Sequence, residues 1–356
     1  MMAITHLADV TDAARLTAVL RKAGVLDAGR VRNVVEIAPP TRKLRSHTFR
    51  LRMDYEGPAS NAPSTLILKI GHLDETGRPI YDNAREIAFY RDVAPELQPS
   101  LVPRCYEVAN ATEGAAWHLL LEDLTETHFI ATQWPIPPAI EQCEQIVRAL
   151  ARIHAGCWDH PQLGVTLGRW YDEAFWERHL QDFAVTLERF TDRFGDVLPP
   201  ERRNLYTRLL DRAPKLLARY HRRRDLTIAH GDAHFWNFFL PKLGTSDDVR
   251  LLDWEGWAIN TASTDLAYML AMLWYPDRRK RFERRLLDHY YAALLANGVS
   301  GYGQSSLDDD YRLSALWLIA RPVWQAMAGI GGGVWWNNLE RIFLAVDDLG
   351  SRELLD

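Results

Sequence analysis

The sequence predicts an α+β fold in which a small β-rich lobe is followed by a larger, mostly helical lobe. Two observations support this order. Three short segments rich in β-branched and aromatic residues lie within the first 70 positions, and helical periodicity dominates after Leu124. The 356 residues are 47% hydrophobic and 25% charged, as in an ordinary globular protein. We therefore expect two domains, residues 1–122 and 123–356.

The β-rich lobe begins with a predicted helix, Thr11–Ala23, which Thr11 or Asp12 caps and Gly24 ends. Short, turn-separated segments then predict an antiparallel meander, and a further helix leads to two more strands. The predicted strands are Val31–Ile37, Phe49–Tyr55, Thr65–Ile70, Arg104–Val108 and Trp117–Leu121, and the helix is Asp82–Val93 with Pro95 as its stop.

The second lobe opens with an amphipathic helix, because Ile140, Cys143, Leu150 and Ile153 recur at helical spacing. More helices are expected between Asp172 and Tyr220, and again from Ser263 onward. One strand pair interrupts them, Asn237–Leu240 and Val249–Asp253, with Lys242–Asp248 as its turn.

Composition narrows the possible functions and partners. A net charge of −5 gives no reason to expect nucleic acid as a partner, and no apolar run is long enough to cross a membrane. Cys105, Cys143 and Cys157 form neither a disulfide framework nor a zinc spacing. With no secretory signal at the N-terminus, we expect a cytoplasmic protein, either a monomer or a homodimer.

The clearest local motif is His230-Gly231-Asp232-Ala233-His234-Phe235-Trp236-Asn237, followed after a short hairpin by Leu252-Asp253-Trp254-Glu255. Phosphoryl transfer needs a carboxylate to orient the attacking hydroxyl and oxygen ligands to hold Mg²⁺ against the phosphates. Asp232, Asn237 and Asp253 supply such groups. Alone, the pattern also fits an ordinary turn with a capping aspartate.

Two upstream segments fit the same chemistry. Lys69 lies inside an apolar strand, where burying it is costly unless an anion meets it. Glu86, on the predicted next helix, is placed to pair with it, although Lys69 on an edge strand would instead face solvent. The segment Leu119-Leu120-Leu121-Glu122-Asp123-Leu124 ends the small lobe, where a linker between lobes would present backbone groups to adenine.

In this order, the strand lysine, helix glutamate, LLLEDL segment, HGDxxxxN loop and DWE segment resemble the aminoglycoside phosphotransferase and choline kinase superfamily, in particular its bacterial ecdysteroid-kinase-like branch. The resemblance covers roughly Val31 to Ala271. It implies a bilobed protein-kinase-like fold and an ATP- and Mg²⁺-dependent kinase that phosphorylates a hydroxyl of a small molecule.

Residue by residue, the resemblance implies that Asp232 is the catalytic carboxylate and that Asn237 and Asp253 bind the metal. It also implies nucleotide binding by Lys69, with Glu86 orienting the amine, and by the hinge at Glu122 and Leu124. Asp265 matches an aspartate that braces the catalytic loop. The loop Thr41–Thr48 contains no glycine, unlike that of protein kinases, and leaves Ser46 with nearby amides as the phosphate cradle.

Two other functions remain open from the sequence. One is a metal-dependent hydrolase using His230, Asp232, His234 and Asp253, which leaves Lys69 unexplained. The other is a non-catalytic nucleotide-binding pseudokinase, which would have no need of an intact metal-binding set. His154 is expected to be a hydrogen-bonded core histidine, and His230 a brace of the catalytic loop.

The acceptor is open as well. An aminoglycoside requires an acidic cluster, for which Asp308-Asp309-Asp310 and Asp347-Asp348 are candidates. An amino alcohol such as choline, or an apolar alcohol, suits the tryptophans concentrated near the C-terminus, which otherwise belong to the core. These are Trp317, Trp324, Trp335 and Trp336.

Overall fold

The chain forms two compact units in the computed structural model, which describes residues 7–42, 46–81, 83–112, 115–244 and 248–356. The first unit comprises Met1–Phe129 and Phe239–Glu255, and the second comprises Ile130–Phe238 and Gly256–Asp356. A β-rich first unit and a largely helical second unit confirm the predicted α+β class. The division expected from the sequence was a single cut after residue 122, whereas Phe239–Glu255 belongs to the first unit.

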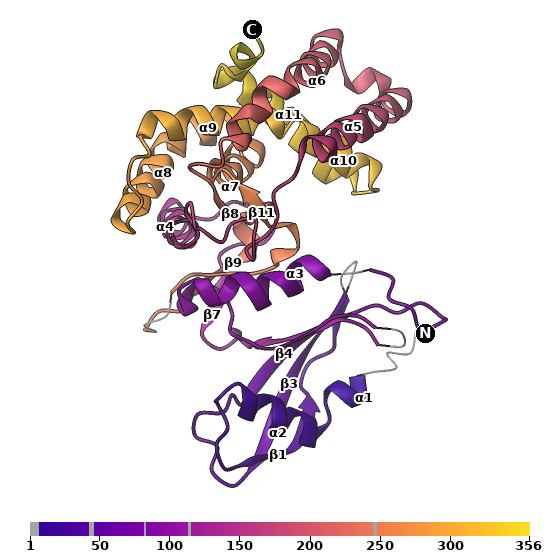
Figure 1. Ribbon diagram of the computed structural model, residues 1–356, viewed down its shortest axis with the longest axis vertical. Helices are drawn as coiled ribbons and strands as arrows, with labels where there is room; N and C mark the ends of the chain where they lie inside the picture. Colours follow the sequence, from indigo (N-terminus) through magenta and orange to yellow (C-terminus); the bar gives the residue numbers. More distant parts are fainter. Residues whose placement is uncertain (1–6, 43–45, 82, 113–114, 245–247) are drawn as a thin grey trace. The chain divides into compact units, whose positions relative to one another are not determined.

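The first unit is built on an antiparallel sheet of order β1-β3-β4-β6-β5, with β2 paired to β3. Strands β1, β3 and β4 are labelled in Figure 1. The central strand of the sheet is β4, which contributes Leu66, Leu68 and Ile70 to the hydrophobic core. This order confirms the predicted meander. The strands are β1 (Arg30–Glu36), β2 (Thr41–Arg42), β3 (Ser46–Glu56), β4 (Thr65–Gly71), β5 (Cys105–Ala109) and β6 (His118–Glu122).

Two helices precede the sheet in the chain, α1 (Leu7–Val10) and α2 (Ala13–Lys22). The Asp12 side chain accepts a hydrogen bond from the Arg15 amide, so Asp12 is the cap, and Gly24 turns the chain at a positive φ of 69°. The apolar face of α2 packs on β1 and contributes Leu16 and Leu20 to the core beneath the sheet. Helix α1 was not predicted.

The helix predicted from Asp82 is shorter and less regular than expected. Helix α3 (Ala84–Ala88) continues into a π-helical turn, Phe89–Val93, and a 3₁₀ turn, Ala94–Glu96. The α- and π-helical part therefore ends at Val93 as predicted, and Pro95 lies at the start of the 3₁₀ turn, where its missing N–H donor is not needed. Asp82 lies outside the described residues.

Several strand predictions need correction. The expected loop Thr41–Thr48 is largely a hairpin, since Thr41 pairs with Thr48 and Arg42 with His47; residues 43–45 lie outside the described part. The predicted pair is present as β9 (Phe238–Pro241) and β10 (Arg250–Leu251), though residues 245–247 of its turn are not described. Three strands were missed because each is only three residues long: β7 (His128–Ile130), β8 (Thr227–Ala229) and β11 (Ala258–Asn260).

The second unit is mostly helical, as expected. Helix α4 packs along α8, and α10 packs against both α5 and α11 (Figure 1). The glycine-rich stretch after α10 breaks the chain before α11, as predicted. The helices are α4 (Ile140–Gly156), α5 (Glu173–Arg193), α6 (Pro200–His221), α7 (Ser263–Leu266), α8 (Pro276–Ala296), α9 (Gln304–Trp317), α10 (Ala320–Met327) and α11 (Gly332–Asp348).

None of the helices in the described ranges is both long and apolar enough to cross a membrane. Cys105, Cys143 and Cys157 form no disulfide in the part of the chain that the structure describes.

Candidate active site

The lysine in the apolar strand is buried in the middle of the first unit's sheet. Lys69 lies on β4 opposite Thr48 of β3 and Leu119 of β6, and it is only 8% exposed. Lys69 therefore does not lie on an edge strand and does not face solvent. A buried ammonium requires anionic partners, because desolvation alone would push it toward its neutral form.

Three carboxylates supply those partners. The Nζ of Lys69 lies 2.7 Å from Glu86 Oε2, 2.8 Å from Asp253 Oδ1 and 3.2 Å from Glu255 Oε1. The predicted pairing of Lys69 with Glu86 is confirmed. Burial lowers the pKa of Lys69, but the carboxylates of Glu86, Asp253 and Glu255 outweigh it and raise the pKa above its usual value. Lys69 is thus a permanent cation at neutral pH.

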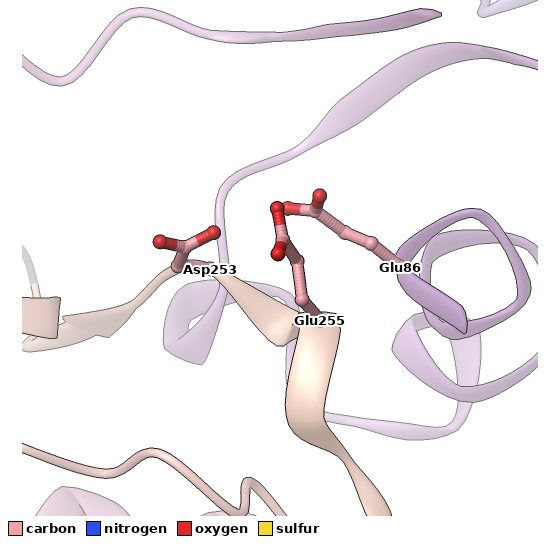
Figure 2. A group of neighbouring side chains, drawn as sticks. All are labelled: Glu86, Asp253 and Glu255. Atoms are coloured by element: carbon pink, nitrogen blue, oxygen red, sulfur yellow. The ribbon is translucent and has the colours of Figure 1, made fainter. Parts of the chain in front are cut away.

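The same carboxylates form a group with the chemistry of a site for a hard cation. Ligand oxygens of Glu86, Asp253 and Glu255 all lie within 4.8 Å of one another (Figure 2). With all three ionised, one ammonium faces three negative charges. Burial, reinforced by the Asp253 carboxylate, raises the pKa of Glu86, as expected where negative charge exceeds positive. Carboxylate oxygens are the ligands that a hard cation such as Mg²⁺ prefers.

The backbone at Asp253 is held in an unusual conformation. Its φ is +67°, a left-handed value that a non-glycine residue adopts at a cost of about 1–3 kcal/mol. The next residue, Trp254, is fully buried and stacks on Phe89 with ring centroids 3.8 Å apart. This stack ties the segment of Asp253 and Glu255 to the helical turn that follows α3, which carries Glu86. The stack of Trp254 on Phe89 therefore holds the segment of Asp253 and Glu255 next to the helix that carries Glu86.

In the second unit, the motif beginning at His230 is braced by a buried aspartate on α7. Asp265 is fully buried and accepts hydrogen bonds from the His230 amide (2.6 Å) and the Gly231 amide (2.8 Å). A third partner is His154 Nε2 at 3.1 Å. Burial raises the pKa of Asp265, but these partners outweigh it and lower the pKa below its usual value. The predicted bracing role is confirmed.

Both His154, expected in the core, and His230, expected as a brace of the loop, are buried. His154 is fully buried and also contacts the Tyr290 hydroxyl at 2.8 Å. His230 is fully buried, and its Nδ1 accepts the Asp232 amide at 3.2 Å. Both act as structural supports of the loop.

A glycine is required at the turn before Asp232. Gly231 has a φ of +77°, and a Cβ there would lie 2.4 Å from the Gly256 carbonyl oxygen. No side chain fits without moving one of the two backbones. The close approach joins the motif to the start of the segment that leads into β11.

The carboxylate of Asp232 faces a cation and a histidine. Arg321 Nη2 on α10 lies 3.1 Å from Asp232 Oδ1, and His234 Nε2 lies 3.7 Å from Oδ2. The side-chain amide of Asn237 donates to the Asp232 carbonyl at 3.0 Å, so the Asn237 oxygen is the atom suited to a metal. Burial, reinforced by the Asp232 carboxylate, raises the pKa of Tyr268 nearby, which stays a neutral phenol.

The remaining predicted nucleotide residues lie in the first unit. Ser46 begins β3 and is 1% exposed. Glu122 ends β6, and its amide donates to the Arg104 carbonyl at 2.8 Å. The Leu124 carbonyl accepts the His128 amide at 2.8 Å in the following turn. Their roles toward a nucleotide stay predictions, as do those of Lys69, Glu86, Asp232, Asn237 and Asp253.

Sequence reasoning missed two residues of these clusters. Glu255 was visible as part of the DWE segment, and its spacing of two from Asp253 was a usable signal. Arg321 had none, because it lies 89 positions beyond Asp232 in an ordinary helical sequence.

The acidic clusters considered for a polycationic acceptor are held in ion pairs. Asp308 pairs with Arg284, and the buried Asp310 pairs with Arg219. Asp347 pairs with Arg352. Asp348 pairs with Arg279 and Lys280. Of the two clusters only Asp309 is exposed without a described ion pair, so neither forms an acidic patch.

Comparison with solved structures shows the same fold over nearly the whole chain. A protein from Ralstonia eutropha JMP134 classed with the aminoglycoside phosphotransferases is 14% identical, covers 95% of this chain and 97% of its own, and has a TM-score of 0.55. Choline kinase from Cryptosporidium parvum is 12% identical, with 95% and 94% covered and a TM-score of 0.53.

Amicoumacin kinase, solved with AMP-PNP, Ca²⁺ and its substrate, is 14% identical, with 93% and 92% covered and a TM-score of 0.51. Other matching aminoglycoside phosphotransferases hold GDP. No curated protein matches the sequence. The model of the ecdysteroid kinase-like family matches residues 42–298, most of the chain. The chain therefore belongs to the ecdysteroid kinase-like family, and it has the fold of the solved aminoglycoside phosphotransferase and choline kinase structures.

Proposed function

We propose that this protein is an ATP- and Mg²⁺-dependent phosphotransferase that phosphorylates a hydroxyl group of a small molecule. The observation that carries the proposal is the cluster of Lys69 with Glu86, Asp253 and Glu255. An ammonium beside three carboxylates suits a triphosphate and its metal ion together, because the ammonium can bind phosphate oxygens while carboxylate oxygens bind the metal ion.

Within this cluster the residues divide the work. Lys69 donates to phosphate oxygens, and the buried Glu86 fixes the direction of its amine. Asp253 and Glu255 would hold Mg²⁺, with Asn237 as a further ligand. When bound, the metal ion offsets negative charge on the β- and γ-phosphates.

Asp232 orients the acceptor hydroxyl and takes its proton. The hydroxyl oxygen forms a bond to the γ-phosphorus, the bond from that phosphorus to the β,γ-bridging oxygen breaks, and ADP leaves with the bonding electrons. The proton passes from Asp232 to solvent. Asp265 keeps the loop in place through its bonds to the His230 and Gly231 amides, so the carboxylate needs no reorganisation during the reaction.

The relatives support this choice of reaction. One of them binds AMP-PNP with a divalent cation, and others bind GDP, so nucleotide use is common in the superfamily. A hydrolase with a histidine-bound metal is less well supported. In the described part of the chain, the group of three or more potential ligands consists of carboxylates alone, and His230 is fully buried as a brace.

The test is ADP release from ATP with a library of hydroxyl compounds, with and without Mg²⁺. We expect acceptor-dependent turnover that Asp232→Ala and Asp253→Ala each reduce by about 100-fold or more, while Asp309→Ala, at an exposed position, has no effect. Full activity in the Asp232→Ala and Asp253→Ala variants would refute the residue assignment.

Two further outcomes separate the alternatives. Tight Mg²⁺-dependent nucleotide binding without turnover of any acceptor would support a pseudokinase. Stoichiometric zinc in the purified protein would support the hydrolase.

A further inference from the structure

An arginine side chain lies against the carboxylate that we assign to the acceptor hydroxyl. Arg321 Nη2 is 3.1 Å from Asp232 Oδ1, and the two side chains are 32% and 35% exposed. At this exposure the ion pair contributes little to stability. Its effect is instead local, because it places a positive charge where an acceptor must bind.

Two aromatic rings lie beside the guanidinium group. The Arg321 Cζ lies 5.4 Å from the centre of the buried Tyr268 ring and 5.2 Å from that of Trp324. Trp324 is 49% exposed and thus presents much of its indole to solvent. The faces of Tyr268 and Trp324, which would otherwise attract a quaternary ammonium, therefore already contact the cation of Arg321.

The guanidinium retains hydrogen-bonding capacity. Of its five N–H donors, one bonds to Asp232 and the Tyr268 hydroxyl is a second hydrogen-bond partner, so other donors remain for a ligand. The Nε of Arg321 is buried and has no partner within the described part of the chain. Because the side chain as a whole is 32% exposed, a ligand oxygen would reach the guanidinium through its terminal N–H groups and not through this inaccessible Nε.

We propose that the acceptor is an alcohol with an oxyanion, such as a carboxylate, on a flat apolar body, and that Arg321 selects it. This inference rests on the proposed function. The hydroxyl binds Asp232, the carboxylate binds the remaining donors of Arg321, and the apolar body lies on Trp324. The transfer is the one described above, with ADP and the phosphate monoester of the hydroxy acid as products. Cationic alcohols are disfavoured because Arg321 repels them.

Pairing of the acidic clusters supports the same choice. Asp308, Asp310, Asp347 and Asp348 each lie in an ion pair with arginine or lysine, so their carboxylates already have cationic partners.

Three matched alcohols test the charge selectivity: 3-(hydroxymethyl)benzoate, 1,3-benzenedimethanol and 3-(hydroxymethyl)benzylamine. They share the ring and the benzylic alcohol and differ in the charge of one substituent. We first follow the Nε–H resonance of Arg321 by ¹⁵N NMR, assigned through its loss in Arg321→Lys. The benzoate is expected to shift this signal saturably and the amine to leave it unchanged. No shift with the benzoate, or an equal shift with the amine, overturns the proposal.

Turnover provides the second readout. We expect kcat/KM to fall from the benzoate to the amine by about tenfold or more, the size expected for one charge-assisted hydrogen bond. Arg321→Gln should remove this preference. Arg193→Gln is the matched control, because Arg193 also lies over a ring, that of Phe194, at 5.1 Å, and should leave the order unchanged. Equal or better turnover of the amine by the wild-type protein contradicts the proposal.

Different results would refute the proposed kinase function and the proposed choice of acceptor. If Mg²⁺-dependent ATP binding is absent, the proposed function is wrong. If ATP binds and the charge order is absent or reversed, the kinase assignment stands and the choice of acceptor is wrong.

Discussion

Replacing Asp265 by asparagine tests how the second unit holds the loop that contains Asp232. The carboxylate accepts from the amides of His230 and Gly231 and contacts His154, and it is fully buried. An asparagine retains one acceptor oxygen and turns its amide toward a donor. At least one charge-assisted bond is lost and a buried N–H is left unpaired. We therefore expect a loss of about 3–5 kcal/mol in the free energy of unfolding.

The pH dependence of this loss has a defined sign. The pKa of Asp265 is lower in the folded protein than its ordinary value of 3.8, so the unfolded chain binds the proton more tightly. The stabilisation from Asp265 is fully present above that ordinary value and is lost as the pH falls through the folded pKa. The difference between wild-type protein and Asp265→Asn should be constant near neutral pH and shrink in acid.

The assay is urea unfolding at neutral pH and in acid, with hydrogen exchange of α4 and α7 to identify the unfolding of the second unit. Asp309→Asn is the control, since this exposed aspartate undergoes the same chemical change and should cost no more than about 0.5 kcal/mol. A cost for Asp265→Asn as small as that of the control, or one unchanged in acid, would refute the reasoning.

Three further predictions follow from the structure. Lys69→Met should lower turnover of ATP by about 100-fold, because three carboxylates lose their cation; steady-state ADP release measures this, and normal turnover contradicts it. Trp254→Ala should cost about 3–5 kcal/mol in unfolding free energy, because the buried indole and its stack on Phe89 are lost; a cost under 1 kcal/mol in urea would count against the packing described. Gly231→Ala should reduce kcat with little change in overall folding by circular dichroism, because its Cβ would meet the Gly256 carbonyl; an unchanged kcat would show that the loop tolerates the shift.

The fold was predictable where the local signal was strong. The meander was visible because its strands are five residues or longer and are bounded by turn residues. The helix from Ile140 was visible because its buried face repeats at helical spacing. The three-residue strands β7, β8 and β11 were not, because so few residues carry no period, and their pairing depends on contacts distant in the chain. Helix α1, at four residues, was missed for the same reason.

The candidate site was predictable in part. Lys69 stood out because a charge in an apolar strand needs a partner, and the structure provides Glu86 at 2.7 Å. Asp265 was found through the family resemblance alone. The contact of Arg321 with Asp232 could not be predicted, because one arginine among many in helical sequence has no distinguishing local pattern. Long-range ion pairs of this kind become visible only when the helices are packed.

Calorimetric titration with AMP-PNP, in the presence and absence of Mg²⁺, tests the central claim most directly. The claim is that Lys69 and the carboxylates around it form a site for a metal–nucleotide complex. The account predicts that Mg²⁺ strengthens nucleotide binding by about tenfold or more and that Asp253→Asn removes this enhancement. Binding of equal strength with and without Mg²⁺, or an enhancement that survives Asp253→Asn, would contradict it.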